Sequence, residues 1–359
     1  MDKLNKYRKL NRSIMATKTQ VLILCLFLFV AIDKGYGAQS YTKLITRAND
    51  LYRSGRFSKA ILMYRKATQR GAEASITAFN IGNCYYRLDD LSNAAASFRR
   101  SLRVNPHRLG AQFNLAGVLF RLGEYGEAIA AYRRGLVKQP ENLSAWLYLS
   151  DAYSRTGDLT GAQRALENAY AQDSNDVSIL YQLGEVHVQL KEYGAAIELV
   201  RMAYQKNPKE IDFLFYMGDL YRTWGKLEES AAVYREGLFQ KPGDVDVLYK
   251  IADVLYLDKK PYIAMEYLQK ALAIKKDYTD AAIFLGNIAF EIKWWERSES
   301  AYRLALNQNN EEGIEGFRNI AYELFSLGRK KKAHQLITEA LLKQPQNRTL
   351  KQDLEMYSD

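Results

Sequence analysis

The sequence predicts an all-α protein built from repeated helical hairpins, and three observations support this prediction. Residues recur with a period of 34, in repeats that start at residues 41, 75, 109, 143, 177, 211, 245, 279 and 314. The eighth, twentieth and twenty-seventh positions of every repeat hold only Gly, Ala or Ser. Five of the six prolines fall at position 32, where a helix must end. Because small residues let one helix pack closely on the next, the pattern indicates stacked helix pairs.

The first element is an N-terminal segment, residues 1–38, that differs from the repeats. Basic residues precede an apolar run at residues 21–32, which is shorter than the about 20 residues of a membrane-spanning helix. The run suits the core of a secretory signal peptide, with Met15 as an alternative start. An uncleaved anchor and a misread core helix are the alternatives. We therefore expect an exported protein, periplasmic or secreted, or else one anchored in the membrane by residues 21–32.

The charge of the chain says little about its partners. The net charge is +10, but residues 1–40 hold seven basic and two acidic residues and so contribute +5 of it. The remaining +5 is modest for more than 300 residues. Without Cys25 of the leader, Cys84 is the one cysteine left, and no intramolecular disulfide can form.

Each repeat then reads as a first helix, a turn, a second helix and a stop. Glycine ends the first helix at position 15 of five repeats, as a C-terminal stop signal. Pro261 falls at the start of the second helix of its repeat, which tolerates proline. Residues 348–359 are polar and periodic enough to form a capping helix, which an open-ended stack needs.

The pattern resembles the tetratricopeptide repeat, a helix–turn–helix unit of 34 residues. Residues 79–106 are the best single match, and Trp146, Leu149 and Tyr153 match well in the fourth repeat. The resemblance implies a right-handed superhelical solenoid of about nine repeats over residues 41–347, with the capping helix after them. It also implies that the first helix of each repeat lines a concave groove through positions 2, 5, 6, 9, 12 and 13.

Polar residues at these positions form the predicted partner-binding groove. A ladder of amides would grip an extended peptide backbone, although ordinary consensus residues are the alternative. The groove would be basic in its N-terminal half and acidic in its C-terminal half, unless these charges are only a solvated face. The predicted polar residues are Asn49, Asn80, Asn83 and Asn114, then Arg53, Arg87, Arg121 and Arg155, and Asp219 and Asp253.

Aromatic residues at positions 5 and 12 would anchor a bound chain, unless they only pack between repeats. They are Phe79, Phe113, Tyr181, Phe215 and Tyr249 at position 5, and Tyr86 and Phe120 at position 12. The carboxylate clamp known in the resembled family needs basic residues where Ile45, Gly110 and Asn114 stand, so chaperone-tail capture is not expected.

These features predict a non-catalytic scaffold whose groove binds a protein or an extended peptide, in the assembly of an envelope or secretion complex. The alternatives are an RNA-binding helical repeat protein and a non-catalytic subunit of an enzyme complex. We expect no enzyme, because no phosphate loop or nucleophile–base pair appears and Cys84 reads as packing. The three histidines occupy different repeats and positions, so we expect neither a metal nor a cofactor. Nucleic acid is not an expected partner, and a membrane is one only through an uncleaved leader.

Overall fold

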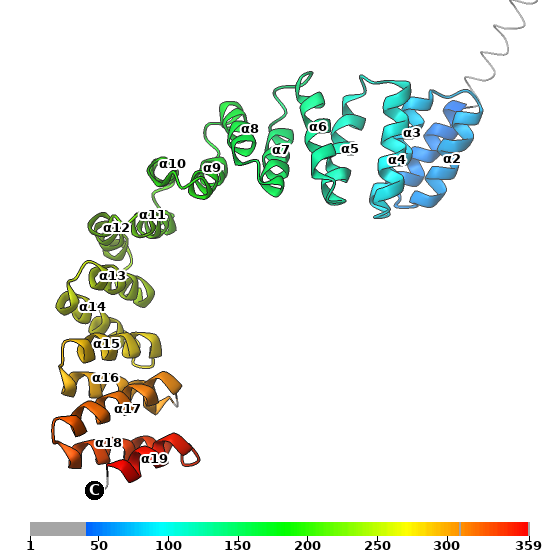
Figure 1. Cartoon of the computed structure of the whole chain (residues 1–359). Coiled ribbons are helices and arrows are strands. Elements are labelled where there is room, and N and C mark those ends of the chain that lie inside the picture. Colours follow the sequence, from blue (N-terminus) through cyan, green and yellow to red (C-terminus); the bar gives the residue numbers. More distant parts are fainter. Residues whose placement is uncertain (1–40, 309, 358–359) are drawn as a thin grey trace, which may run out of the picture. The chain divides into compact units, whose positions relative to one another are not determined.

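The computed structural model describes residues 41–308 and 310–357, which fold into helices joined by short turns (Figure 1). The predicted signal peptide and its alternatives lie outside these residues. The contacts divide the chain into two compact units, and the boundary in the sequence falls between Ser174 and Asn175. The described part of unit 1 begins with a helix over residues 41–53. It continues with α2 (Phe57–Gln69), α3 (Ala74–Arg87), α4 (Leu91–Val104), α5 (Leu109–Arg121), α6 (Tyr125–Leu136), α7 (Leu143–Thr156) and α8 (Leu159–Gln172).

Unit 2 holds the remaining helices. They are α9 (Val177–Gln189), α10 (Tyr193–Lys206), α11 (Asp212–Thr223), α12 (Leu227–Gln240), α13 (Val245–Leu257), α14 (Pro261–Ile274), α15 (Thr279–Glu291), α16 (Trp295–Asn307), α17 (Glu311–Ser326), α18 (Lys330–Lys343) and α19 (Arg348–Met356). Helix α17 begins three residues before the start at 314 that the period gives for the ninth repeat.

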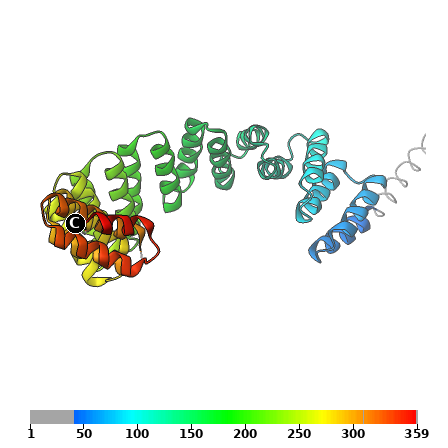
Figure 2. The same cartoon turned by 60° about the horizontal axis from the view of Figure 1, so that its bottom comes forward.

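Within each unit a helix packs mainly against its neighbours in sequence, as both views show (Figure 1 and Figure 2). The small residues of the period lie at these crossings. The ring of Phe98 covers Gly82, and the ring of Tyr234 covers Gly218, so closely that a Cβ at either glycine would lie within 2.7 Å of a ring carbon. The sequence period therefore reports how near the two helices of a repeat approach each other.

The turn at position 15 has a left-handed backbone in every repeat. Five glycines adopt it, and so do Asp89, Lys191, Lys259 and Lys293, whose φ angles lie between 58° and 62°. Left-handed backbone costs a residue with a side chain about 1–2 kcal/mol relative to the right-handed region. The same turn geometry therefore holds whether glycine or a longer residue occupies the position.

Helix α19 closes unit 2 against α18. Asn347 caps its first turn by accepting a hydrogen bond from the backbone N–H of Leu350 at 3.2 Å. Leu350 is fully buried, and Asp353 pairs with Arg318 of α17 at 2.6 Å. A polar helix with a buried leucine thus covers the apolar side of the last hairpin.

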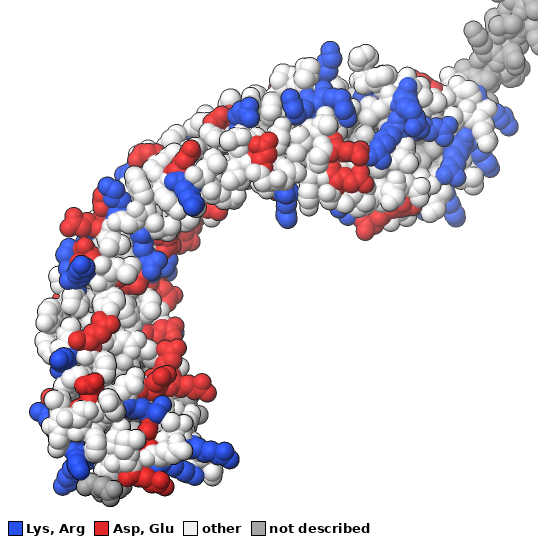
Figure 3. Space-filling view, viewed as in Figure 1, with Lys and Arg blue, Asp and Glu red and all other residues white. Residues whose placement is uncertain are grey.

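Acidic side chains gather along the right-hand side of unit 2 in Figure 3. Around Tyr249, burial and then the carboxylates of Asp253, Asp280 and Glu312 raise the pKa of the phenol. One of these acids, Asp253, also has a partner within unit 2, because it pairs with Arg222 at 2.6 Å.

Candidate functional site

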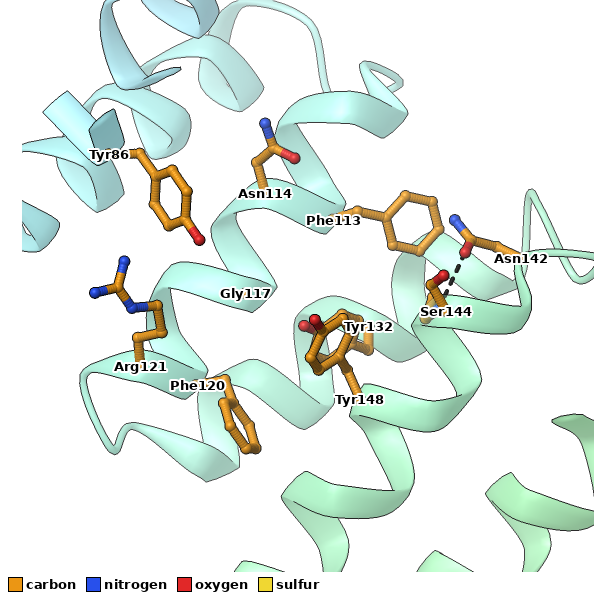
Figure 4. Close-up of a pocket in the computed structure, with 11 residues that line it drawn as sticks. Tyr86, Phe113, Asn114, Gly117, Phe120, Arg121, Tyr132, Asn142, Ser144 and Tyr148 are labelled. Carbon is orange, nitrogen blue, oxygen red and sulfur yellow. Dashed lines mark hydrogen bonds between the residues drawn. The ribbon is translucent and has the colours of Figure 1, made fainter. Parts of the chain in front are cut away.

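A pocket of about 410 Å³ opens in unit 1 between α3, α5, α6 and α7 (Figure 4). Tyr86 reaches it from α3, Phe113 and Phe120 from α5, Tyr132 from α6 and Tyr148 from α7. The remaining lining residues are Asn114, Gly117, Arg121, Asn142, Ser144 and Ala145. Five of the predicted groove residues meet here: Tyr86, Phe113, Asn114, Phe120 and Arg121.

The walls of the pocket are aromatic. The rings of Tyr132 and Tyr148 stack 6.2 Å apart with an angle of 9° between their planes. Phe120 tilts against Tyr148 at 6.3 Å, and Phe113 packs over Gly135 of α6. Tyr148 is 54% exposed and Tyr86 is 41% exposed, whereas Tyr132 is buried. Two exposed rings thus stand beside a buried floor, which suits an apolar side chain that enters from solvent.

Three polar groups border this aromatic surface. Asn114 donates a hydrogen bond from Nδ2 to Asn83 Oδ1 at 2.8 Å. Arg121 pairs with Asp89 at 2.6 Å while its guanidinium lies over the ring of Tyr86, 5.2 Å from the centroid. Burial, with a smaller effect from Tyr148, raises the pKa of Tyr132 well above its ordinary value. The Tyr132 hydroxyl therefore remains a neutral hydrogen-bond donor at physiological pH.

Most other predicted groove residues of unit 1 contact side chains of their own unit. Asn49 accepts a hydrogen bond from the Tyr64 hydroxyl at 2.6 Å, and Phe79 packs against Phe98. Arg87 lies over the ring of Phe57. Asn80 is half-buried on α3, outside the lining of the pocket. Two further arginines pair within their own helices: Arg53 with Asp50 at 3.6 Å and Arg155 with Asp151 at 3.8 Å. Every position-13 arginine thus has an acidic or aromatic neighbour.

The predicted residues of unit 2 pack in the same way. Tyr181 packs on Tyr216 at 5.3 Å, Phe215 covers Gly237, and Tyr249 packs on Phe284 at 5.5 Å. Asp219 accepts hydrogen bonds from Tyr234 and Lys250, and Asp253 accepts one from Arg222. These residues occupy positions 5 and 9 on the first helices of their repeats, and none of them lines the pocket of unit 1.

Sequence reasoning missed Gly117, Tyr132, Tyr148 and Ser144 as members of a site. A signal for two of them was present, because Tyr148 and Ser144 occupy the inward positions 6 and 2 of the fourth repeat. Tyr132 reads only as a large packing residue at position 24. Gly117 is the one glycine at position 9, where other repeats carry Asn, Asp, Glu or Tyr. The missing side chain at position 9 was the feature of the sequence that could have predicted a pocket in the third repeat.

The part of the chain that the structure describes also bears on metal binding and on membrane insertion. Residues 41–308 and 310–357 contain no group of three or more His, Cys, Asp or Glu side chains placed to hold a metal ion. In the same residues no helix combines the length and apolar character needed to cross a membrane.

Comparisons with known proteins agree with the helical hairpins. A family model of the tetratricopeptide repeat matches residues 45–107, 89–143, 113–162 and 147–211. The chain is similar to the C-terminal part of a TPR repeat-containing protein from Cytophaga hutchinsonii, with a TM-score of 0.51 and 18% identity over 67% of this chain and 99% of that one. No curated protein matches the sequence.

Two further solved structures align with lower TM-scores. A tetratricopeptide repeat protein from Parabacteroides merdae aligns over 80% of this chain and all of its own, at 16% identity and a TM-score of 0.44. YrrB, described as a TPR protein with an unusual peptide-binding site, aligns over 52% of this chain and 96% of its own, at 23% identity and a TM-score of 0.40. The predicted all-α repeat solenoid is confirmed by the helices and by the Cytophaga structure together.

Proposed function

The chain belongs to the tetratricopeptide repeat family, and from this premise we propose that it is a non-catalytic scaffold that binds an extended segment of a partner protein in unit 1. Protein interaction is the general role of such repeats. The finer proposal is that the pocket between α3, α5, α6 and α7 anchors one side chain of the partner.

The aromatic pocket is the observation that carries this proposal. Tyr148 and Tyr86 are large aromatic residues that remain about half exposed beside a hollow of about 410 Å³. Exposed aromatic rings around a concavity are typical binding anchors, because a partner side chain removes much apolar surface from water at little entropic cost. The rings of Tyr132 and Tyr148 already stack, so the wall is formed before a partner arrives.

A selection from a library of random 12-residue peptides on the purified chain tests the proposal. We expect peptides that bind the chain and whose affinity falls about tenfold or more in the Tyr148→Ala variant, since this change removes one wall of the pocket. The matched control is Phe239→Ala, because Phe239 is 86% exposed in unit 2 and lines none of the pocket. Selection of no peptide, or equal weakening by the two variants, would contradict the proposal.

We further propose that the scaffold serves in assembly of an envelope or secretion complex. The basic segment and the apolar run at residues 21–32 support this setting. Sequencing the N-terminus of the protein purified from its natural host tests it: a start near residue 39 supports export, whereas intact residues 21–32 in a soluble cytosolic fraction refute it.

A further inference from the structure

The residues around the pocket also indicate which side chain of a partner it accepts, an inference that rests on the proposed function. The repeats of this chain serve as internal references for the third repeat. Position 24 is tyrosine in four repeats, and in three of them its hydroxyl donates to the side chain at position 9 of the same repeat. The pairs are Tyr64 with Asn49 at 2.6 Å, Tyr234 with Asp219 at 2.5 Å and Tyr302 with Asn287 at 2.5 Å.

The side chain at position 9 accepts a second kind of hydrogen bond, from position 6 of the following repeat. Lys250 donates to Asp219 at 2.7 Å, Tyr216 donates to Glu185, and Asn114 donates to Asn83 at 2.8 Å. Position 9 is therefore an oxygen acceptor that links two repeats. Asp219 accepts from both directions at once.

The third repeat has both donors but no acceptor. Its position 9 is Gly117, its position 24 is Tyr132, and position 6 of the next repeat is Tyr148. Neither phenol hydroxyl forms a hydrogen bond with any residue that the structure describes. In Figure 4 the two tyrosines lie beside Gly117 at the centre of the pocket. There is room for a side chain beside Tyr132, because a Cβ at residue 117 would lie at an ordinary contact distance of 3.6 Å from the Tyr132 hydroxyl oxygen.

The neighbouring charges favour a neutral acceptor. In the first and eighth repeats the tyrosine donates to an asparagine, whereas Asp219 of the sixth repeat also has a cation, Lys250, beside it. No carboxylate lines the pocket, and its one cation, Arg121, already pairs with Asp89 at 2.6 Å. Among the described residues, Asp219 is the one carboxylate that accepts from a position-24 tyrosine, and it has a cation beside it; a carboxylate that accepted from Tyr132 would lack that cation.

An amide also matches the third polar group. Asn114 lines the pocket (Figure 4) and uses Nδ2 to bind Asn83, which leaves its Oδ1 as an acceptor. That oxygen can accept a hydrogen bond from an amide N–H, whereas it would repel a carboxylate oxygen.

We propose that a side-chain amide of the bound peptide, from glutamine or asparagine, takes the place of the missing position-9 side chain and accepts hydrogen bonds from Tyr132 and Tyr148. Its aliphatic stem packs between Phe113, Phe120 and the stacked tyrosines. The partner thus supplies the group that Asn49 and Asn287 supply within their own repeats.

Synthetic, fluorescently labelled versions of the selected 12-residue peptides test this inference by fluorescence anisotropy on the full chain. Each glutamine or asparagine of a peptide is replaced singly by leucine and by the matching acid. At one position of the peptide we expect replacement by leucine to weaken binding to the wild-type chain about tenfold, which corresponds to the loss of about two net hydrogen bonds. We expect replacement by glutamate or aspartate at the same position to weaken binding at least as much.

The variant Gly117→Asn restores an acceptor from within the chain, so we expect it to bind the amide peptide and its leucine counterpart equally. Gly117→Ala is the control: it adds a methyl group but no oxygen, and we expect it to keep the preference for the amide. Circular dichroism establishes that both variants fold.

The outcomes separate the two proposals. If peptides bind through Tyr148 but no amide replacement matters, or the acid binds more tightly, the amide inference is overturned and the scaffold function stands; a peptide backbone carbonyl in the pocket would give the first of these results. If wild-type and Gly117→Asn chains show the same preference, the inference is likewise overturned. If no peptide is selected, the scaffold proposal fails and the inference fails with it.

Discussion

At the scale of single residues, one hydroxyl group has different surroundings in different repeats. The Tyr64 hydroxyl donates to Asn49, whereas the Tyr132 hydroxyl faces the space beside Gly117. The two tyrosines are both buried, with exposed fractions of 2% and 3%. The two residues therefore differ in hydrogen bonding rather than in overall burial, and this separates a residue that stabilises a repeat from one available to a partner.

This difference predicts unequal costs for the same substitution. We expect Tyr64→Phe to lower the free energy of unfolding by about 1 kcal/mol, because it removes a hydrogen bond and leaves the Asn49 oxygen without its donor. Tyr132→Phe breaks no hydrogen bond among the described residues, so we expect a change within about 0.5 kcal/mol. Urea unfolding followed by circular dichroism measures both values, and equal losses would contradict the assignment.

The half-buried ion pair of Glu339 with Arg303 predicts a dependence of stability on pH. The hydrogen bonds from Arg303, at 2.6 and 2.8 Å, lower the pKa of the Glu339 carboxyl against the opposing effect of burial. Because the folded pKa lies below the unfolded one, this carboxylate contributes stability above its ordinary pKa of 4.5 and loses it as the pH falls through the folded pKa.

Melting temperatures between pH 3 and pH 7 test this prediction. We expect Glu339→Gln to lower the melting temperature most near pH 7, and the gap to the wild-type chain to narrow below about pH 4.5. Glu236→Gln is the control, since Glu236 is exposed and forms no ion pair among residues 41–308 and 310–357. A gap for Glu339→Gln that stays constant with pH would refute the role of the ion pair.

At the scale of the helices, the first and second helix of a repeat approach each other over position 8. Gly82 lies under the ring of Phe98, and a Cβ there would come within 2.6 Å of a ring carbon. Gly184 faces Val200 instead, and a Cβ there would lie 3.5 Å from the nearest methyl carbon. The same residue type at the same position thus fits two different helix contacts.

Alanine at these two glycines should shift stability in opposite directions. We expect Gly184→Ala to raise the free energy of unfolding by up to about 1 kcal/mol, the helix propensity gained. Gly82→Ala should lower it by about 1–3 kcal/mol, because the Phe98 ring must move out of a packed position. Thermal unfolding of the two variants gives the comparison, and stabilisation by both would show that Phe98 yields without cost.

The sequence predicted the helices well because their periodicity comes from local packing. Small residues at three positions and prolines at one are properties of each repeat by itself, and they locate the hairpins. The pocket depends on three successive repeats, and its key residue is a glycine whose departure from the residues at position 9 of the other repeats gains a meaning only when those repeats are stacked. Lys250, which pairs with Asp219, and Asp89, which pairs with Arg121, also come from other repeats, so these side-chain directions could not be read from the period.

At the scale of the whole molecule, each of the two units is held together by its own internal contacts. In each unit the helices contact mainly their nearest neighbours in sequence. Such arrays gain stability from local interfaces, so a part of the array can fold without the rest. All eleven residues that line the pocket belong to unit 1.

A fragment of residues 41–174 should therefore retain the proposed function. We expect it to be helical by circular dichroism and to bind the selected peptides within about threefold of the full chain, because no lining residue is removed. Residues 175–359 form the control fragment, for which we expect no binding of the same peptides. A folded fragment of unit 1 that fails to bind would show that unit 2 contributes to the site.

The left-handed turns at position 15 indicate where the free energy of unfolding of the chain is below its optimum. Lys191, Lys259 and Lys293 hold a backbone conformation that glycine adopts without steric cost, and all three belong to unit 2. Each turn keeps its geometry despite the cost of about 1 kcal/mol. Natural chains persist above a threshold of stability rather than at its optimum. The three lysine turns are thus positions at which a change to glycine would add stability without altering the hairpin.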